Sequence, residues 1–124
     1  MIKIEHLSKT YGNLAVLKDV NAEIKKGEVI SIIGPSGTGK STFLRCLNLL
    51  ETPSSGDIYI DGENIFPKKV KTSRIRLKMG MVFQSFNLFE HLSVLDNITL
   101  GPVKLLKKTK TDAEKKAIEL LQVV

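Results

Sequence analysis

Alternating polar and apolar residues in the first third of the chain predict β-strands. Residues 3–7 alternate in this way, and residues 20–24 do the same. Turn formers at residues 11–13 and 25–28 separate these segments from their neighbours. Residues 29–33 are β-branched and almost wholly apolar, which is typical of a strand buried on both faces.

Helical spacing of apolar residues begins after a glycine-rich segment. It predicts a helix over residues 40–50, with one apolar face. That face comprises Phe43, Leu44, Leu47 and Leu50. Residues 53–56 interrupt the pattern, and residues 57–60 are expected to form a short strand that ends at the Asp61-Gly62 turn.

The second half of the chain is expected to contain shorter elements. A helix is predicted near residues 72–78, and a short buried strand at 81–83. Ser93 can cap a helical turn through Ile98. Thr111 and Glu114 have the spacing of a capping box and predict the start of a last helix. Its expected apolar side comprises Ala113, Ala117, Ile118, Leu120 and Leu121, and no stop signal follows it.

The composition is that of an ordinary folded domain. A chain of 124 residues suits one domain, and 42% hydrophobic with 26% charged residues excludes a disordered tail or a fibre. No apolar run approaches the roughly 20 residues needed to cross a bilayer. The acid at position 5 argues against a secretory signal, and a single cysteine favours a reducing compartment. Cys46 is interpreted as a core residue.

The net charge of +6 arises entirely after residue 62. Residues 63–124 hold twelve basic and six acidic side chains, whereas residues 1–62 hold seven of each. An acid-free stretch carries much of the excess, on Lys68, Lys69, Lys71, Arg74, Arg76 and Lys78. We interpret this stretch as a solvated helix or loop that could face an anionic membrane surface. Nucleic acid is disfavoured because no aromatic residue is interleaved.

The glycine-rich segment carries the clearest chemistry. Its pattern G-x-x-x-x-G-K-[ST] is that of a P-loop, with a predicted strand before it and a helix after it. The matching residues are Gly34, Pro35, Ser36, Gly37, Thr38, Gly39, Lys40 and Ser41. The glycines let backbone N–H groups approach phosphate oxygens, and the helix N-terminus adds its positive dipole end. Lys40 supplies a charge for the β- and γ-phosphates, Ser41 a hydroxyl for Mg²⁺, and Thr42 a donor for the α-phosphate.

The segments around the P-loop resemble the ATP-binding subunits of ABC transporters. Tyr11 lies in the sequence Lys-Thr-Tyr-Gly, and Gln84 follows Gly-Met-Val-Phe. Residues 91–98 are most similar to the branch that serves bacterial polar amino-acid importers. The resemblance implies that Tyr11 stacks on adenine. It also implies that Gln84 reaches Mg²⁺ and the attacking water and couples the site to transport.

The same resemblance implies partners and a location. Two such subunits would close head-to-tail over two ATP molecules, and membrane-spanning permease subunits would hold them at the cytoplasmic face of the cell membrane. The apolar residues Phe86, Leu88, Phe89 and Leu92 have two interpretations: core packing, or a partly exposed groove for a helix of the permease.

Three later motifs of the family are absent from these 124 residues: the signature, the second acidic motif and the switch histidine. Asp61 is interpreted as a turn residue, and His6 and His91 as ordinary surface or core histidines. We therefore expect the N-terminal part of a nucleotide-binding domain over residues 1–124. Its fold would be α/β, an incomplete P-loop NTPase core with an antiparallel N-terminal β portion. It should bind ATP weakly and hydrolyse it negligibly. Two alternatives stay open at this point, a soluble nucleotide kinase and a non-catalytic fragment.

Overall fold

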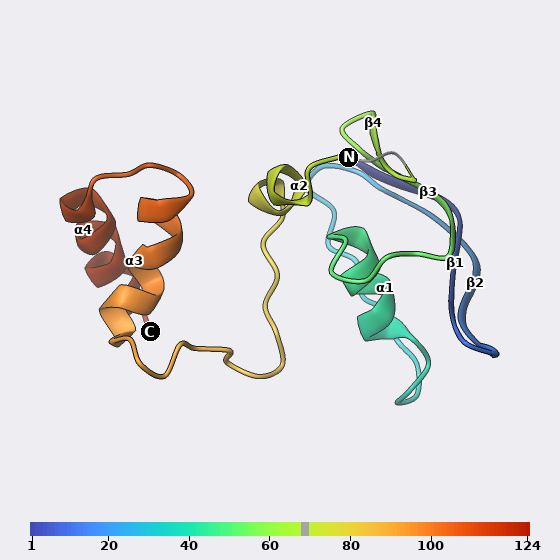
Figure 1. Cartoon of the computed structure of the whole chain (residues 1–124), viewed down its shortest axis with the longest axis horizontal. Helices are drawn as coiled ribbons and strands as arrows, with labels where there is room; N and C mark the ends of the chain where they lie inside the picture. Colours follow the sequence, from blue (N-terminus) through green and yellow to red (C-terminus); the bar gives the residue numbers. More distant parts are fainter. Residues whose placement is uncertain (68–69) are drawn as a thin grey trace. The chain divides into compact units, whose positions relative to one another are not determined.

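The computed structural model describes residues 1–67 and 70–124, which form two compact units (Figure 1). The first unit comprises Met1–Met81 and the second comprises Val82–Val124. Lys68 and Lys69, from the predicted basic stretch, lie outside the described residues.

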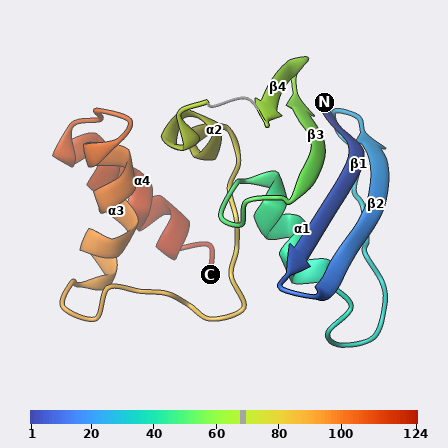
Figure 2. The same cartoon turned by 45° about the vertical axis from the view of Figure 1, so that its right-hand side comes forward.

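The first unit contains an antiparallel sheet of four strands in the order β2-β1-β3-β4 (Figure 2). The strands are β1 (Ile2–Tyr11), β2 (Leu14–Ile24), β3 (Ser55–Ile60) and β4 (Glu63–Phe66). Three of them confirm predicted strands and extend beyond the expected bounds. The sequence did not predict β4, because four residues that include a glutamate and an asparagine are too few to show a clear alternation.

The Asp61-Gly62 turn between β3 and β4 confirms the turn interpretation of Asp61. Both residues adopt positive φ angles, 49° and 80°, as a two-residue hairpin turn of type I′ requires. Aspartate tolerates this backbone region and glycine has no side chain to oppose it. Asp61 therefore occupies the first central position of this hairpin turn.

Two helices pack on the sheet and complete the core of the first unit. They are α1 (Lys40–Leu47) and α2 (Thr72–Lys78), and the bounds of α2 agree with its prediction. The core combines residues of the sheet with residues of both helices. It comprises Ile4, Leu7, Leu17, Cys46, Leu47, Ile58, Ile60, Ile65 and Ile75. Cys46 is confirmed as a core residue, and burial raises the pKa of its thiol.

The predicted helix over residues 40–50 ends earlier, at Leu47. Asn48 is the C-cap, and Leu49 turns the chain with a φ of 55°. Of the expected apolar face, Leu47 is buried and Phe43 half-buried, whereas Leu44 and Leu50 are exposed.

Two predicted strands are wrong. Residues 29–33 and 81–83 are not strands, and Val29, Ile33 and Val82 expose more than nine tenths of their surface. A buried parallel strand needs hydrogen-bonded neighbours on both sides. Within residues 1–67 and 70–124, none pairs with either segment. The composition indicated β-propensity correctly, but propensity alone does not supply a partner strand.

The second unit is a pair of helices, α3 (Val94–Lys104) and α4 (Lys110–Leu121). Ser93 caps α3 as predicted, with its hydroxyl accepting a 3.1 Å hydrogen bond from the Asp96 amide. The helix then continues beyond the predicted turn, through Pro102.

The predicted cap of α4 is wrong. The cap is Thr109, whose hydroxyl accepts from the Asp112 amide at 3.1 Å. Two overlapping motifs, Thr-x-x-Asp and Thr-x-x-Glu, compete for this helix start, and the earlier one holds it, so Thr111 lies inside the first turn. Ala113 and Ala117 are buried as expected, whereas Ile118, Leu120 and Leu121 are exposed.

Among the described residues, no helix combines the length and the apolar character that crossing a membrane demands.

Candidate nucleotide-binding site

The P-loop lies between the exposed segment 29–33 and α1. Gly37 and Gly39 adopt positive φ angles of 80° and 89°. A Cβ atom on Gly39 would lie 2.8 Å from Cγ1 of Val16, a residue of β2, and 3.0 Å from its carbonyl oxygen. The end of the loop therefore packs so closely against β2 that only glycine fits at position 39.

The N-terminus of α1 leaves backbone donors for an anion. Gly39 is its N-cap and provides no side chain to accept from the first-turn amides, and no acidic residue lies in that turn. The first hydrogen bond of the helix joins the Phe43 amide to the Gly39 carbonyl at 2.8 Å. The amides of Lys40, Ser41 and Thr42 thus have no acceptor within the helix, and the helix dipole adds partial positive charge there.

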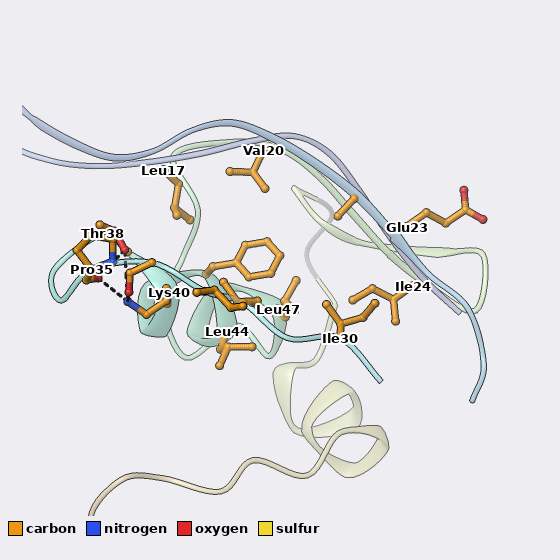
Figure 3. Close-up of a pocket in the computed structure, with 16 residues that line it drawn as sticks. Leu17, Val20, Glu23, Ile24, Ile30, Pro35, Thr38, Lys40, Leu44 and Leu47 are labelled. Atoms are coloured by element: carbon orange, nitrogen blue, oxygen red, sulfur yellow. Dashed lines mark hydrogen bonds between the residues drawn. The ribbon is translucent and has the colours of Figure 1, made fainter. Parts of the chain in front are cut away.

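The ammonium group of Lys40 lies over the same loop. Its Nζ donates to the carbonyl oxygen of Gly34 at 2.7 Å and also to that of Pro35 (Figure 3). The Thr38 hydroxyl donates to the Pro35 carbonyl at 2.9 Å. The partners of Lys40 are neutral oxygens, and a charge-assisted hydrogen bond to a phosphate is stronger than a bond to a neutral carbonyl. Lys40 can therefore leave these carbonyls for a phosphate.

Tyr11 is the last residue of β1 and is 43% exposed. The ammonium of Lys9 is 4.6 Å from the ring centroid. The pKa of Tyr11 is raised, first because the surrounding protein removes water from its hydroxyl and next because the Glu51 carboxylate is near. The Lys9 ammonium and the Thr42 hydroxyl act on this pKa in the opposite direction. Tyr11 and the P-loop belong to the same compact unit.

Gln84 belongs to the second unit, where it is exposed in a bend. The P-loop belongs to the first unit, and the predicted role of Gln84 stays a prediction. Phe86, Leu88 and Phe89 follow Gln84 and are all more than half exposed. Core packing is therefore wrong for these three side chains, while Leu92 is half-buried.

A cavity of about 620 Å³ borders the P-loop on its apolar side. It lies between β2, α1 and the segment that leads into the loop, with Leu17, Val20, Ile30 and Leu44 on its walls (Figure 3). These apolar side chains offer no hydrogen bonds to a polyanion, and burying its charge against them would be unfavourable. The cavity is space left between these apolar surfaces, and the phosphate-binding surface is the polar edge of the loop beside it.

The described residues offer few groups for a metal. They contain no cluster of three or more His, Cys, Asp or Glu side chains that could hold an ion. Mg²⁺ commonly keeps several waters and binds through substrate phosphates and few protein ligands. The exposed Ser41 hydroxyl at the start of α1 fits that pattern.

Neither histidine belongs to the loop. His6 is exposed on β1, where its Nδ1 lies 2.7 Å from Asp19 Oδ1, and His91 is exposed against the edge of Phe89. The surface interpretation of both histidines is confirmed.

The fold and the loop define a P-loop nucleotide-binding protein, and comparison with known proteins identifies the family. Residues 17–124 match the ABC transporter family, so the chain belongs to it. This membership contradicts the alternative of a soluble nucleotide kinase. The structure is also similar to dimeric structures of MJ0796, a bacterial ABC transporter cassette, one of them in a post-hydrolysis state bound to ADP and Pi. That one matches with a TM-score of 0.87 and 38% identity, over 98% of this chain and 56% of the other. The predicted class, an incomplete ABC ATPase-like α/β fold, is confirmed.

The similar sequences are ATP-binding proteins of amino-acid transporters. The arginine transport ATP-binding protein ArtM of Bacillus subtilis is 52% identical over all 124 residues, and the glutamate/aspartate import ATP-binding protein GltL of Escherichia coli is 47% identical. The glutamine transport ATP-binding protein GlnQ of Geobacillus stearothermophilus is also 47% identical. The chain spans about half the length of these relatives, 51–52% of each.

Two contacts of the site were missed by sequence reasoning. Lys9 precedes Tyr11 by two residues on the same strand, so the period of two could have placed both side chains on one face. Val16 left no signal, because its approach to Gly39 depends on how β2 passes the loop.

Proposed function

We propose that the chain binds magnesium–ATP as the N-terminal part, residues 1–124, of an ABC transporter nucleotide-binding domain. One observation carries the proposal: the uncapped N-terminus of α1, with Lys40 lying over the preceding loop. Backbone amides, a helix dipole and a mobile cation all favour an anion at this place.

The other residues take roles around the phosphates. Gly34 and residues 36–39 supply backbone N–H groups, while Pro35, which has none, shapes the loop. Ser41 supplies a ligand for Mg²⁺, and Thr42 a donor for the α-phosphate. Tyr11 offers an aromatic face to the adenine, and base–aromatic stacking contributes about 1–3 kcal/mol. Gln84 binds Mg²⁺, orients the attacking water and couples the site to transport in the whole protein.

In the whole protein, ATP hydrolysis drives import of a polar amino acid. The names of the arginine, glutamate/aspartate and glutamine transport relatives support this class of cargo. The 124 residues contain neither the signature nor a second acidic motif, and phosphoryl transfer needs groups that hold the metal and orient water. The chain by itself therefore binds ATP weakly and turns it over negligibly.

The proposed partners are membrane-spanning permease subunits and a second ATP-binding subunit, at the cytoplasmic face of the cell membrane. The exposed side chains of Phe86, Leu88 and Phe89 support a contact surface for a permease helix. No nucleic-acid partner is proposed. Of the described basic residues of α2, Arg74 and Lys78 both lie near the Glu63 carboxylate.

Calorimetry with magnesium–ATP tests the binding. The Lys40→Ala variant should weaken binding at least tenfold, because it removes the cation over the loop. Lys18→Ala should stay within twofold, since Lys18 is an exposed lysine of β2 outside the loop. Equal affinity of Lys40→Ala and the unchanged chain would contradict the proposal.

The alternative of a non-catalytic fragment makes different experimental predictions. It predicts concentration-dependent self-association and no thermal shift with nucleotide. A rise of the melting temperature with magnesium–ATP that Lys40→Ala abolishes would exclude it.

A further inference from the structure

The end of α1 opposite the P-loop is held by an arginine. Nη2 of Arg76 donates to the carbonyl oxygen of Leu49 at 2.9 Å, and its Nε donates to that of Asn48 at 3.4 Å. These carbonyls follow the last turn of the helix, where the dipole places partial negative charge. A guanidinium with two donors in one plane matches two adjacent carbonyls.

The neighbouring basic residues of α2 have a different partner. Arg74 Nη2 lies 3.4 Å from Oε2 of Glu63, and Lys78 Nζ lies 3.5 Å from the same oxygen. Ile75, between Arg74 and Arg76, is fully buried in the core and anchors α2 against the first unit. Arg76 therefore joins a fixed helix to the end of α1, whereas Arg74 joins that helix to β4.

Asn48 gives the end of α1 a second connection. Its side chain is 5% exposed, and its amide Nδ2 lies 2.9 Å from the sulfur of Met81. Its Oδ1 accepts from the Leu50 amide at 3.1 Å, which fixes the amide group. Met81 precedes Gln84 by three residues, so α2 and the segment that leads to Gln84 both contact the same end of α1.

We propose that Arg76 is a positioning residue for nucleotide binding. It fixes the C-terminal end of α1 and so sets the direction in which the amides of residues 40–42 face the phosphates. An eight-residue helix is only about 12 Å long and moves as a rod, so a change at one end is passed to the other. This inference rests on the proposed nucleotide-binding function, although Arg76 itself does not touch the nucleotide.

The first test compares magnesium–ADP with adenosine, which has the same base and ribose but no phosphate. Calorimetric affinities for both ligands are measured with the unchanged chain, Arg76→Gln and Arg74→Gln. Arg76→Gln should weaken magnesium–ADP binding at least fivefold and leave adenosine binding within twofold. Arg74→Gln removes an equal charge from the same helix and should change neither. Arg76→Lys should fall between, because a lysine donates to one carbonyl without the planar pair of donors.

The ratio of the two affinities separates positioning from stability. General loss of folded protein lowers the apparent affinity for ADP and adenosine by the same factor, whereas a displaced α1 affects only the binding that depends on the phosphates. Equal losses for both ligands, equal effects of Arg76→Gln and Arg74→Gln, or no effect of Arg76→Gln would each overturn the proposal. Arg76→Lys replaces Arg76→Gln in this comparison where the latter does not fold.

Amide hydrogen exchange without nucleotide gives an independent measurement. Exchange at residues 43–47 of α1 should be at least fivefold faster in Arg76→Gln than in Arg74→Gln, because the end of the helix frays. Unchanged exchange would overturn the anchoring of α1. If exchange is faster in Arg76→Gln but the unchanged chain binds neither magnesium–ADP nor adenosine, the anchoring of α1 by Arg76 is supported and the nucleotide-binding function is rejected. The failure of this inference and the failure of the proposed function are therefore distinguishable.

Discussion

The amino group of Met1 donates a 2.8 Å hydrogen bond to Oδ1 of Asp61, and the Asp61 amide donates back to the Met1 carbonyl at 2.8 Å. This reciprocal contact joins the start of the chain to the turn between β3 and β4. The N-terminal ammonium lowers the pKa of Asp61 below its ordinary value of 3.8, first through the hydrogen bond and then through its charge.

A pH dependence of stability follows from this contact. Because the folded-state pKa of Asp61 is below the unfolded one, its contribution to the free energy of unfolding is present above about pH 4 and is lost as the pH falls through the folded pKa. Asp61→Asn keeps a residue that tolerates positive φ and removes the charge. Urea denaturation from pH 7 to pH 3 should show a lower stability of Asp61→Asn at pH 7 and a difference that shrinks in acid.

Acetylation of the N-terminus is the matched control, because it removes the partner charge and leaves Asp61 in place. After acetylation, the difference in unfolding free energy between the chain with Asp61 and the Asp61→Asn variant should be small and should change little with pH. A stability difference between the unchanged chain and the Asp61→Asn variant that stays constant over the whole pH range would contradict the assignment.

Alanine substitutions at two glycines of the P-loop distinguish the energetic cost of backbone strain from the cost of close packing. Gly37→Ala and Gly39→Ala both place a side chain at positive φ, which costs about 1–2 kcal/mol. The added Cβ has open space at position 37 but would lie 2.8 Å from Val16 at position 39. Gly39→Ala should therefore reduce the free energy of unfolding by about 1–3 kcal/mol more than Gly37→Ala. Chemical denaturation of both variants measures the difference, and equal losses would refute the close approach.

The start of α4 provides a second matched pair. Thr109→Ala removes the hydroxyl that accepts from the Asp112 amide and should cost about 1 kcal/mol. Thr111→Ala changes a residue inside the first turn and should stay within about 0.5 kcal/mol of the unchanged chain. Denaturation followed by helical circular dichroism compares them. A larger loss for Thr111→Ala would restore the cap that the sequence predicted.

The two isoleucines Ile58 and Ile33 test the location of the core. Ile58 is fully buried on β3, whereas Ile33 is 93% exposed before the P-loop. Ile58→Ala should cost about 2–5 kcal/mol, and Ile33→Ala should stay within about 0.5 kcal/mol. Equal losses in urea denaturation would mean that residues 29–33 are buried in solution.

The nucleotide-binding motif and the local elements were determined by the sequence itself. The P-loop pattern at residues 34–41, the Asp61-Gly62 turn and the bounds of α2 depend on residues close together in the chain. Glycine and aspartate accept positive φ more readily than most residues, and helical spacing needs no distant partner. These features could therefore be predicted before any tertiary contact was known.

Only the tertiary structure decided which apolar segments are strands and which residues meet across the chain. Residues 29–33 have the composition of a buried strand, yet a strand exists only where another segment accepts and donates its backbone hydrogen bonds. The packing of Val16 on Gly39 and the bonds from Arg76 to the end of α1 likewise join residues 23 and more positions apart. No local pattern encodes such contacts, because they depend on where the folded chain brings its distant parts together.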